Sequence, residues 1–427
     1  MSWRHHVVDA RPLRTSAAFR HLWLGSAVGA MGMQVANLAV LLQVWEITRS
    51  AVWTGTIGLA VAVPLLVFGL VGGSLADSFD RRTVVAVSAV GQLLAAVALT
   101  AQAMAGMASV ALVLVLVAAE STANALGAPA RRTFPVRLLP TGQVTAGIAL
   151  QSMAFQGATL VGPAVGGLVL ARWGFSGAYA LHVVTALVAL GAVARLPSLR
   201  PVRDEDPTHD RAPRRAARGG WRIVLERPVL RGSFLTDLAA TVLAMPISLF
   251  PLVNELRFDG NPRTLGLFLS AVAAGGLGAG LLSGLFTRVR RAGLLQLGAA
   301  TTWGVALAGF GFAEQAGLAL AFLAVAGAAD TVSVVTRSAM VQVETPDRFR
   351  GRVSSVEHVV GVAGPEVGNF RGGVVASLTS APTSLVLGGL GAAATVVLVG
   401  LRNRPLRDYV PPGHGTHHPS DGEPAAV

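Results

Sequence analysis

Long apolar stretches, separated by short polar segments, run along almost the whole chain. A helix needs about 20 apolar residues to cross the roughly 30 Å hydrocarbon core of a membrane, whereas a spanning strand needs only about 10. The stretches have the length of helices, so we expect an all-α membrane protein with twelve transmembrane helices. Their approximate limits are 20–46, 52–76, 84–105, 108–128, 142–171, 174–195, 229–253, 264–287, 293–312, 316–338, 351–378 and 383–401.

The first stretch follows several arginines and therefore resembles the start of a secretory signal peptide. The apolar part of a signal peptide has about 7–15 residues. Here it continues past Gly32 to Trp45, and further stretches of the same kind follow. We therefore interpret it as a retained first transmembrane helix.

Composition supports a membrane environment. Of 427 residues, 52% are hydrophobic and 13% are charged, whereas soluble domains have about 25% charged residues. The 50 glycines fit close helix packing in lipid. There is no cysteine, which excludes disulfides and thiolate metal sites. We predict neither metal nor cofactor, because the histidine pairs fall in predicted solvated tails: His5, His6, His414, His417 and His418.

The formal net charge of +12 would suggest a nucleic-acid partner in a soluble protein. Its placement argues for membrane orientation instead. With both termini inside, all but five of the 34 basic residues lie in cytoplasmic segments. We therefore expect a multi-pass inner (plasma) membrane protein with both termini cytoplasmic and no nucleic-acid partner. The five exceptions are Arg49, Arg172, Arg257 and Arg263 in outer loops and Arg371 within a span.

An internal repeat relates the two halves of the chain. A shift of 206 or 207 positions places residues 69–81 on 276–288, and Gly166 and Gly167 on Gly372 and Gly373. Parallel repeats of this kind build transporters whose halves are related by an axis along the membrane normal. We predict two pseudo-symmetric six-helix halves, at residues 1–200 and 229–405. A linker at 201–228 joins them, and a disordered tail follows at 406–427.

Several motifs resemble the major facilitator superfamily. GSLADSFDRR, from Gly73 to Arg82, resembles its signature GxxxDRxGRR between spans two and three, although Ser78 and Asp80 depart from it. GATLVGPAVGG, from Gly157, resembles the GxxxGPxxGG antiporter motif of its drug exporters. APARRTFPVRLLP and RSAMVQVETPDRFRGRV resemble the branch that includes the enterobactin exporter. The resemblance implies a secondary transporter with the major facilitator fold, in which spans one, four, seven and ten line a central cavity.

The two short motifs supply candidate gating and packing residues. We expect Asp77 to latch the inner gate and Arg81 and Arg82 to hold the loop at the head-group level, the alternative being that these arginines only set topology. A mid-span proline is expected to bend span five, and the glycines around it to permit close helix contact. The gating set is Gly73, Asp77, Arg81 and Arg82, and the span-five set is Gly157, Gly162, Pro163, Gly166 and Gly167.

Acidic groups inside spans are candidates for proton coupling or substrate binding, because burying them in lipid is costly. Glu120 is the only charge in span four, which lacks the arginine of many proton-coupled drug exporters, and it lies about 16 Å from Arg131, near mid-membrane. Asn124 shares its helix face, and Asp330 corresponds to Asn124 in the repeat. We therefore expect Glu120 and Asp330 to approach the central cavity from opposite sides of the bundle and to bind and release a proton there. Structural pairing, such as Glu366 with Arg371, is the alternative. The full set is Glu120, Asn124, Asp330, Glu366, Gln34 and Asn37.

Gln34 and Asn37 are neutral, so bonding between helices is the more natural role for them. Asp237, near the start of span seven, is expected to face water.

Other function classes find little support in the sequence. The chain has no lysine, so it contains neither a Walker A loop nor a Schiff-base site, and no GxSxG or HExxH motif suggests an enzyme. We predict proton-coupled efflux of a small amphipathic molecule, such as a drug, siderophore or secondary metabolite, by a monomer in the lipid bilayer. An importer of the same fold, or a receptor or scaffold that does not transport, stays open.

Overall fold

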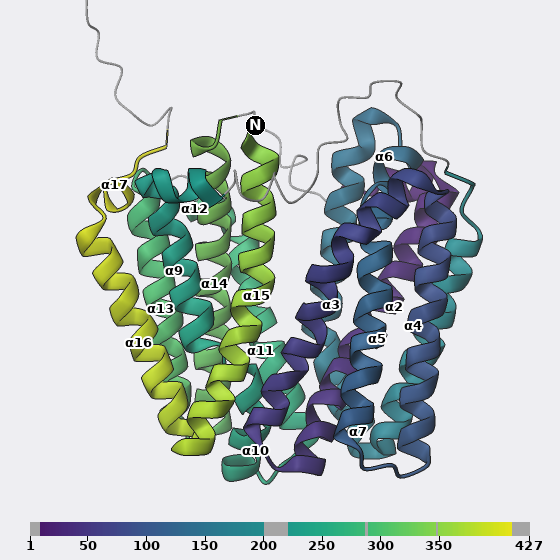
Figure 1. Cartoon of the computed structure of the whole chain (residues 1–427), viewed down its shortest axis with the longest axis horizontal. Helices are drawn as coiled ribbons and strands as arrows, with labels where there is room; N and C mark the ends of the chain where they lie inside the picture. The colour runs from purple at the N-terminus through teal and green to yellow at the C-terminus, as the bar shows by residue number, and fades with distance from the viewer. Residues whose placement is uncertain (1–8, 200–220, 287–288, 347–348, 412–427) are drawn as a thin grey trace, which may run out of the picture.

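Helices follow the predicted apolar stretches closely. The computed structural model describes residues 9–199, 221–286, 289–346 and 349–411, and every regular element within them is a helix (Figure 1). The long helices are α2 (Ala17–Thr48), α3 (Ala51–Ser78), α4 (Arg81–Met104), α5 (Val110–Arg132), α7 (Val144–Ala194), α9 (Pro228–Ala244), α11 (Pro262–Leu281), α13 (Ala292–Phe312), α14 (Ala316–Glu344), α15 (Arg350–Leu378) and α16 (Ala381–Arg402). The short ones are α1 (Arg11–Thr15), α6 (Phe134–Leu138), η2 (Thr141–Gln143), η4 (Ile247–Leu249), α10 (Phe250–Phe258), α12 (Ser283–Phe286) and α17 (Arg404–Arg407).

Helix α7 contains the fifth and sixth predicted spans. Its 51 residues are interrupted at Gly174, whose φ of 63° and ψ of −163° suit glycine alone. The arms on either side run in opposite directions along α2, because Gly162 packs against Gln34 and Gly166 against Leu38, whereas Ala192 packs against Gly25. The chain therefore crosses the membrane, reverses at Gly174 and crosses back.

The twelve predicted spans are confirmed within the described residues. Ten segments are long and apolar enough to cross a membrane, and the reversal at Gly174 divides one of them into two. The remaining span is α15, which has 29 residues but carries Glu357, Glu366 and Arg371, and these charges lower its hydropathy. It packs in the bundle between α3, α9 and α16.

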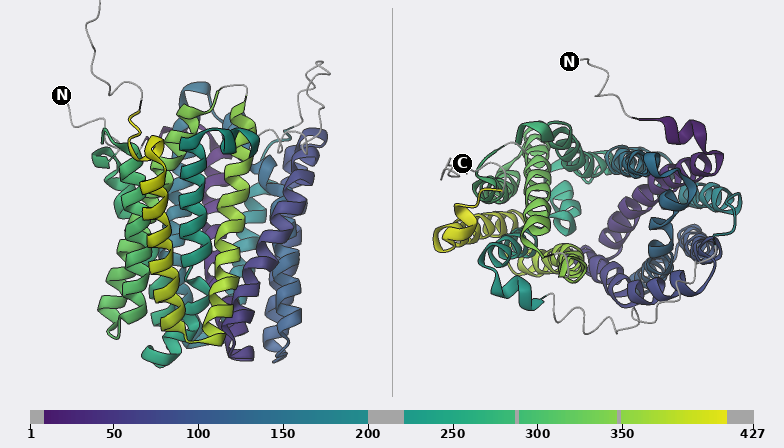
Figure 2. Two further views of the ribbon diagram at one scale, coloured as in Figure 1. Left: turned by 60° about the vertical axis from the view of Figure 1, so that its left-hand side comes forward. Right: turned by 90° about the horizontal axis from the view of Figure 1, so that it is seen from above.

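The helices form two bundles, α2 to α7 and α9 to α16, which meet along two seams (Figures 1 and 2). At one seam α7 packs on α11, and at the other α15 packs on α3. A Cβ added at Gly167 would clash with the carbonyl oxygen of Pro262, and one at Gly373 with that of Ala51. Glycines that correspond in the repeat thus make corresponding contacts between the halves.

The two ends of the molecule differ. The bundles meet at the end of the molecule that carries α10, and we call this the α10 end (Figure 1). At the opposite end, which carries α6, α12 and α17, the ribbons of the two bundles stand apart, and we call this the α17 end. Near the α10 end, Phe250, Phe268 and Phe310 pack edge to face with ring centroids 5.4–5.6 Å apart. Exposed side chains such as Leu94 and Val115 lie on outer helix faces and suit contact with lipid.

Parts of the predicted linker and tail belong to the packed structure. Residues 200–220 and 412–427, with the tail histidines and most linker arginines, lie outside the described residues, as do His5 and His6. Residues 221–226 are helical, and Ile223 and Val224 join a hydrophobic cluster of the second bundle. Leu406 is fully buried and Tyr409 nearly so, because both pack against the same bundle.

Candidate functional site

A cavity of about 450 Å³ lies between the two bundles. Both halves contribute walls, from α2, α3, α5 and α7 on one side and from residues 245–248 after α9, α10, α11, α13 and α15 on the other. Apolar side chains dominate its lining, and the polar members are Gln34, Asn37, Thr54, Glu120, Ser121, Asn124, Thr159, Ser248, Glu366 and Asn369. Helix α14, the tenth span, contributes no lining residue, which differs from the arrangement that the family resemblance implied, because α14 packs behind α11 and α13.

Glu120 reaches the cavity from the middle of α5. Its Oε1 lies 2.8 Å from Nε2 of His182, which comes from the second arm of α7. The Glu120 side chain keeps 16% of its surface exposed, whereas that of His182 keeps 5%. The carboxylate thus faces the cavity while the imidazole holds it from behind. An acid and an imidazole in hydrogen-bond contact can hold or release a proton as a unit.

His182 was not predicted as a site residue. Like Glu120, it is an ionisable side chain inside an apolar stretch. It was missed because only acidic side chains were considered as charged candidates within the spans. A neighbouring polar group was overlooked as well. The Tyr179 hydroxyl donates to Oε1 of Gln43 at 2.6 Å, and Gln43 bonds to Gln102 at 3.1 Å, so that α2, α4 and α7 are tied together close to the Glu120 pair.

Three neutral candidates line the same cavity. Nδ2 of Asn37 donates to Oε1 of Gln34 at 3.1 Å, so these two bond within α2 and not between helices as expected. Asn124 lies one turn from Glu120 and accepts hydrogen bonds from Arg131 through both its side chain and its backbone carbonyl. Arg131 also contacts the Ser88 hydroxyl on α4 and is not part of the lining.

Glu366 approaches the cavity from the opposite half. Its Oε2 accepts from Nδ2 of Asn369 at 3.2 Å, and its carboxylate lies against Gly58 of α3, where any side chain would collide with it. Arg371 points elsewhere, because its guanidinium donates to the carbonyl of Leu243 and packs at Gly388. The pairing of Glu366 with Arg371 is therefore not found.

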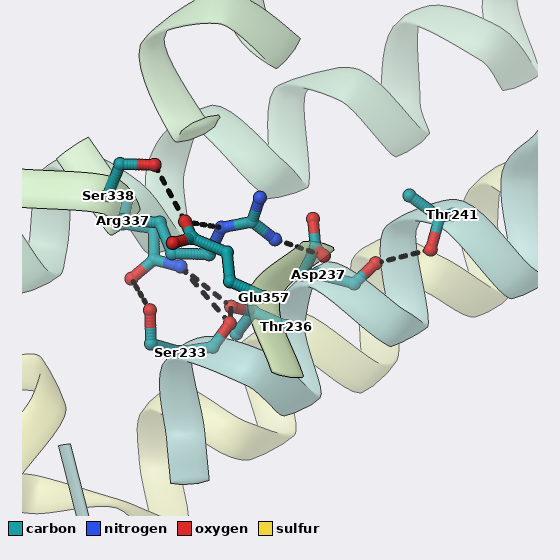
Figure 3. Close-up of polar contacts among 8 residues, drawn as sticks. Ser233, Thr236, Asp237, Thr241, Arg337, Ser338 and Glu357 are labelled. Atoms are coloured by element: carbon teal, nitrogen blue, oxygen red, sulfur yellow. Dashed lines mark hydrogen bonds and ion pairs between the residues drawn. The ribbon is translucent and has the colours of Figure 1, made fainter. Parts of the chain in front are cut away.

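Asp330 does not meet Glu120 across the bundle. It lies outside the cavity lining, with an accessible side chain, and interacts electrostatically with Asp237 and Arg337 of its own half. Asp237 does not simply face water, since it forms an ion pair with Arg337 and only 11% of its side chain is exposed. Glu357 completes the cluster, with Oε1 3.9 Å from Nε of Arg337 and 2.7 Å from the Ser338 hydroxyl (Figure 3).

Among the described residues of the first half, this charged cluster has no charged counterpart. The repeat places Arg131 at the position of Arg337, but Arg131 bonds to neutral Asn124 and Ser88. Arg337 is 5% exposed and holds α9, α14 and α15 together, as Figure 3 shows. Removing one member of such a buried pair is costly because the other charge stays buried without a partner.

The loop between α3 and α4 is held by Asp80, at a position where the sequence departs from the family signature. The Asp80 carboxylate caps α4 by accepting from the backbone N–H of Arg82 at 2.8 Å, and it also accepts from the Ser198 hydroxyl and the Leu199 N–H. Burial alone would raise the pKa of Asp80, but the hydrogen bonds from Ser198 and these backbone N–H groups outweigh it and lower the pKa.

The predicted gating residues lie around this turn. Arg82 donates to the Ala194 carbonyl at 2.7 Å and Arg81 to that of Ala76 at 3.4 Å, both within the first half. Asp77 is exposed and has no hydrogen bond or ion pair with a described residue. A Cβ added at Gly73 would meet open space.

The span-five motif packs α7 against two helices. Gly162 and Gly166 contact α2, whereas Gly167 contacts the start of α11 in the other half. The Pro163 carbonyl lies against Gly266 of α11, and the helix continues through Pro163. Gly157 faces open space instead.

Contacts between polar groups of the two halves gather at the α10 end. Nε1 of Trp45 donates to Oε2 of Glu255 at 2.6 Å, and Arg49 forms an ion pair with the same carboxylate oxygen. The Thr54 hydroxyl donates to the Ser248 carbonyl at 2.7 Å. Arg49 has a φ of 49°, which is unusual for a residue other than glycine. We call Trp45, Arg49 and Glu255 the α10-end latch.

The amino-acid sequence is similar to those of known transport proteins. Residues 9–412 match the family model of transmembrane secretion effectors. The chain belongs to this family of the major facilitator superfamily. It is 25% identical over 410 residues to the enterobactin exporter EntS of Escherichia coli K12, covering 94% of this chain and 96% of the relative.

Solved structures show the same fold. The nucleoside transporter NupG matches with a TM-score of 0.71 at 11% identity, over 91% of this chain and 99% of that one. A bacterial homologue of the human lysosomal transporter Spinster matches with a TM-score of 0.68 at 15% identity, over 93% and 97% of the two chains. The chain is thus a multi-pass membrane protein with the major facilitator fold, in a family of transporters.

Proposed function

We propose that this chain is a proton-coupled exporter that carries a small amphipathic molecule out of the cytoplasm. The observation that carries the proposal is Glu120, an acid at mid-span that faces a largely apolar cavity and is held by His182. A carrier exchanges its substrate for protons when one site meets both and alternates between the two sides of the membrane. The name of the relative as an enterobactin exporter supports the outward direction.

The remaining features of the proposal concern place and assembly. The chain lies in the inner (plasma) membrane with its α17 end in the cytoplasm, because most arginines lie at that end. Residues 1–200 and 229–405 then rock about the cavity. It acts as a monomer, since both halves of one chain enclose the cavity, with a small molecule, protons and lipid as its partners and no nucleic acid. An importer or a non-transporting receptor lacks comparable support.

Transport in inverted membrane vesicles tests this function. A pH gradient, acidic inside, should drive uptake of substrate in vesicles that carry the wild-type protein. Glu120→Gln keeps the size of the side chain but cannot titrate, so uphill uptake should fall by at least about tenfold while downhill exchange continues. His182→Gln should shift the pH dependence of uptake. Unchanged uphill transport with unchanged pH dependence in both variants would exclude this pair as the coupling site.

A further inference from the structure

The charges that face the cavity are unbalanced. Two carboxylates, Glu120 and Glu366, belong to the lining, and the described lining residues include no arginine, lysine or histidine. The basic groups nearby are already engaged, since His182 bonds to Glu120 and Arg131 bonds to Asn124 and Ser88. A ligand in this cavity therefore meets negative charge without a matching positive group.

The two carboxylates differ in their partners. Glu120 has an imidazole at 2.8 Å, which can neutralise it. Glu366 has a neutral amide donor, Asn369, at 3.2 Å and no ion pair with a described residue. A carboxylate in an apolar setting gains most from a cation that replaces the water it has lost. Glu366 is therefore the group with a free charge to offer a ligand.

The surroundings of Glu366 fit an apolar body that carries one positive charge. Gly58, on the facing helix α3, leaves room for its carboxylate at the seam of the two halves. Partly exposed apolar side chains such as Ile57 and Leu269 belong to the same lining and suit contact with an apolar body. An anion would add to two negative charges and would find no basic side chain in the lining.

We propose that Glu366 is the cation-recognition residue of this carrier and that its cargo is a lipophilic monocation, such as a protonated amine with an apolar body. The proposal rests on the proposed export function and divides the work between the two carboxylates. Glu366 pairs with the cation, and Glu120 with His182 exchanges the proton. Because the two carboxylates come from different halves, the rocking of the halves changes the distance between the cation and the proton site.

Equilibrium binding to purified protein in nanodiscs tests the proposal without transport. Tetraphenylphosphonium and tetraphenylborate have nearly the same shape and opposite charge, and triphenylphosphine oxide is a neutral relative. Radiolabelled tetraphenylphosphonium should bind saturably above the level of protein-free nanodiscs at a pH well above the usual carboxyl range. Each of the other two compounds is measured in its own direct binding assay, because tetraphenylborate forms an ion pair with tetraphenylphosphonium, and each should bind at least about tenfold more weakly.

Variants identify the carboxylate. Glu366→Gln should weaken tetraphenylphosphonium binding by about tenfold or more, Glu366→Asp should keep most of it, and Glu120→Gln should have the smaller effect. Equally tight direct binding of tetraphenylborate, or a larger loss in Glu120→Gln than in Glu366→Gln, would overturn the proposal. The comparison of ions needs only wild-type protein, so it decides the matter even if Glu366→Gln does not fold. Binding without any vesicle transport would count against the export function and not against the cation site.

Discussion

At the residue scale, Asp77 in the last turn of α3 and Asp80 just after that helix differ in their contacts. Asp80 caps α4 and ties the loop between α3 and α4 to Ser198 and Leu199, so Asp80→Ala should lower the free energy of unfolding by about 1 kcal/mol, as the loss of other helix caps does. Its pKa is lowered in the folded state, so its stabilisation is present at neutral pH and is lost as the pH falls through that pKa. Thermal unfolding of both proteins between neutral and acidic pH measures this, and the difference in melting temperature should shrink towards acid.

Asp77 provides the matched control. It is exposed and has no described partner, so Asp77→Asn should leave the melting temperature unchanged. We expect this carboxylate to act when the α17 end closes, so the same variant should slow transport. A lower melting temperature together with normal transport would reverse the roles assigned to the two residues.

The residue scale also shows how far the sequence predicts the site. Glu120, Asn124, Glu366, Gln34 and Asn37, each a polar group in an apolar stretch, all line the cavity, and their roles in proton coupling or substrate binding stay predictions. The partners of these groups were not predictable. His182, the partner of Glu120, lies 62 residues away from it in the chain. Asp330 interacts with Asp237 and Arg337 of its own half and not with Glu120. Such pairs depend on how the helices rotate against each other, which a single sequence does not specify.

At the element scale, the α10-end latch joins the loop after α2 to α10. Glu255→Gln removes the ion pair with Arg49 and weakens the bond from Trp45, so the α10 end should open more often. Ile57 lines the cavity on α3, and a cysteine placed there reports access to the cavity in a chain that has no other cysteine. An impermeant thiol reagent added outside intact cells should label Ile57→Cys faster when Glu255→Gln is also present.

Glu314→Gln is the control for charge. Glu314 is exposed at the same end of the molecule, before α14, and has no ion pair with a described residue. The change of charge is therefore the same, but the latch stays intact. Equal labelling rates of Ile57→Cys in the Glu255→Gln and Glu314→Gln proteins would show that the latch does not hold the α10 end closed.

At the scale of the whole molecule, the sequence predicts the arrangement of the helices better than it predicts the end at which the two halves contact each other. The twelve spans and the two halves follow from hydropathy and from the repeat, and Gly167 and Gly373 make the contacts that the repeat implies. Which end is closed depends on contacts between residues far apart in the chain, such as Trp45 with Glu255. Only the packed structure shows that polar contacts between the halves, such as that of Arg49 with Glu255, gather at the α10 end.

The proposed direction of transport and the labelling from outside both depend on the orientation of the chain in the membrane. All but five of the 34 basic residues lie in the segments predicted to be cytoplasmic, and four of the exceptions, including Arg49 and Arg257, lie at the opposite end of the predicted spans. Translocation of positively charged loops is disfavoured, so the α17 end should face the cytoplasm. Thr141, the first residue of η2 at the α17 end, and Ala108, in the loop between α4 and α5 at the α10 end, are both exposed and suited to single cysteines. An impermeant maleimide should label Ala108→Cys in intact cells and Thr141→Cys only after permeabilisation. The opposite pattern would invert the topology, and the α10-end latch would then face the cytoplasm.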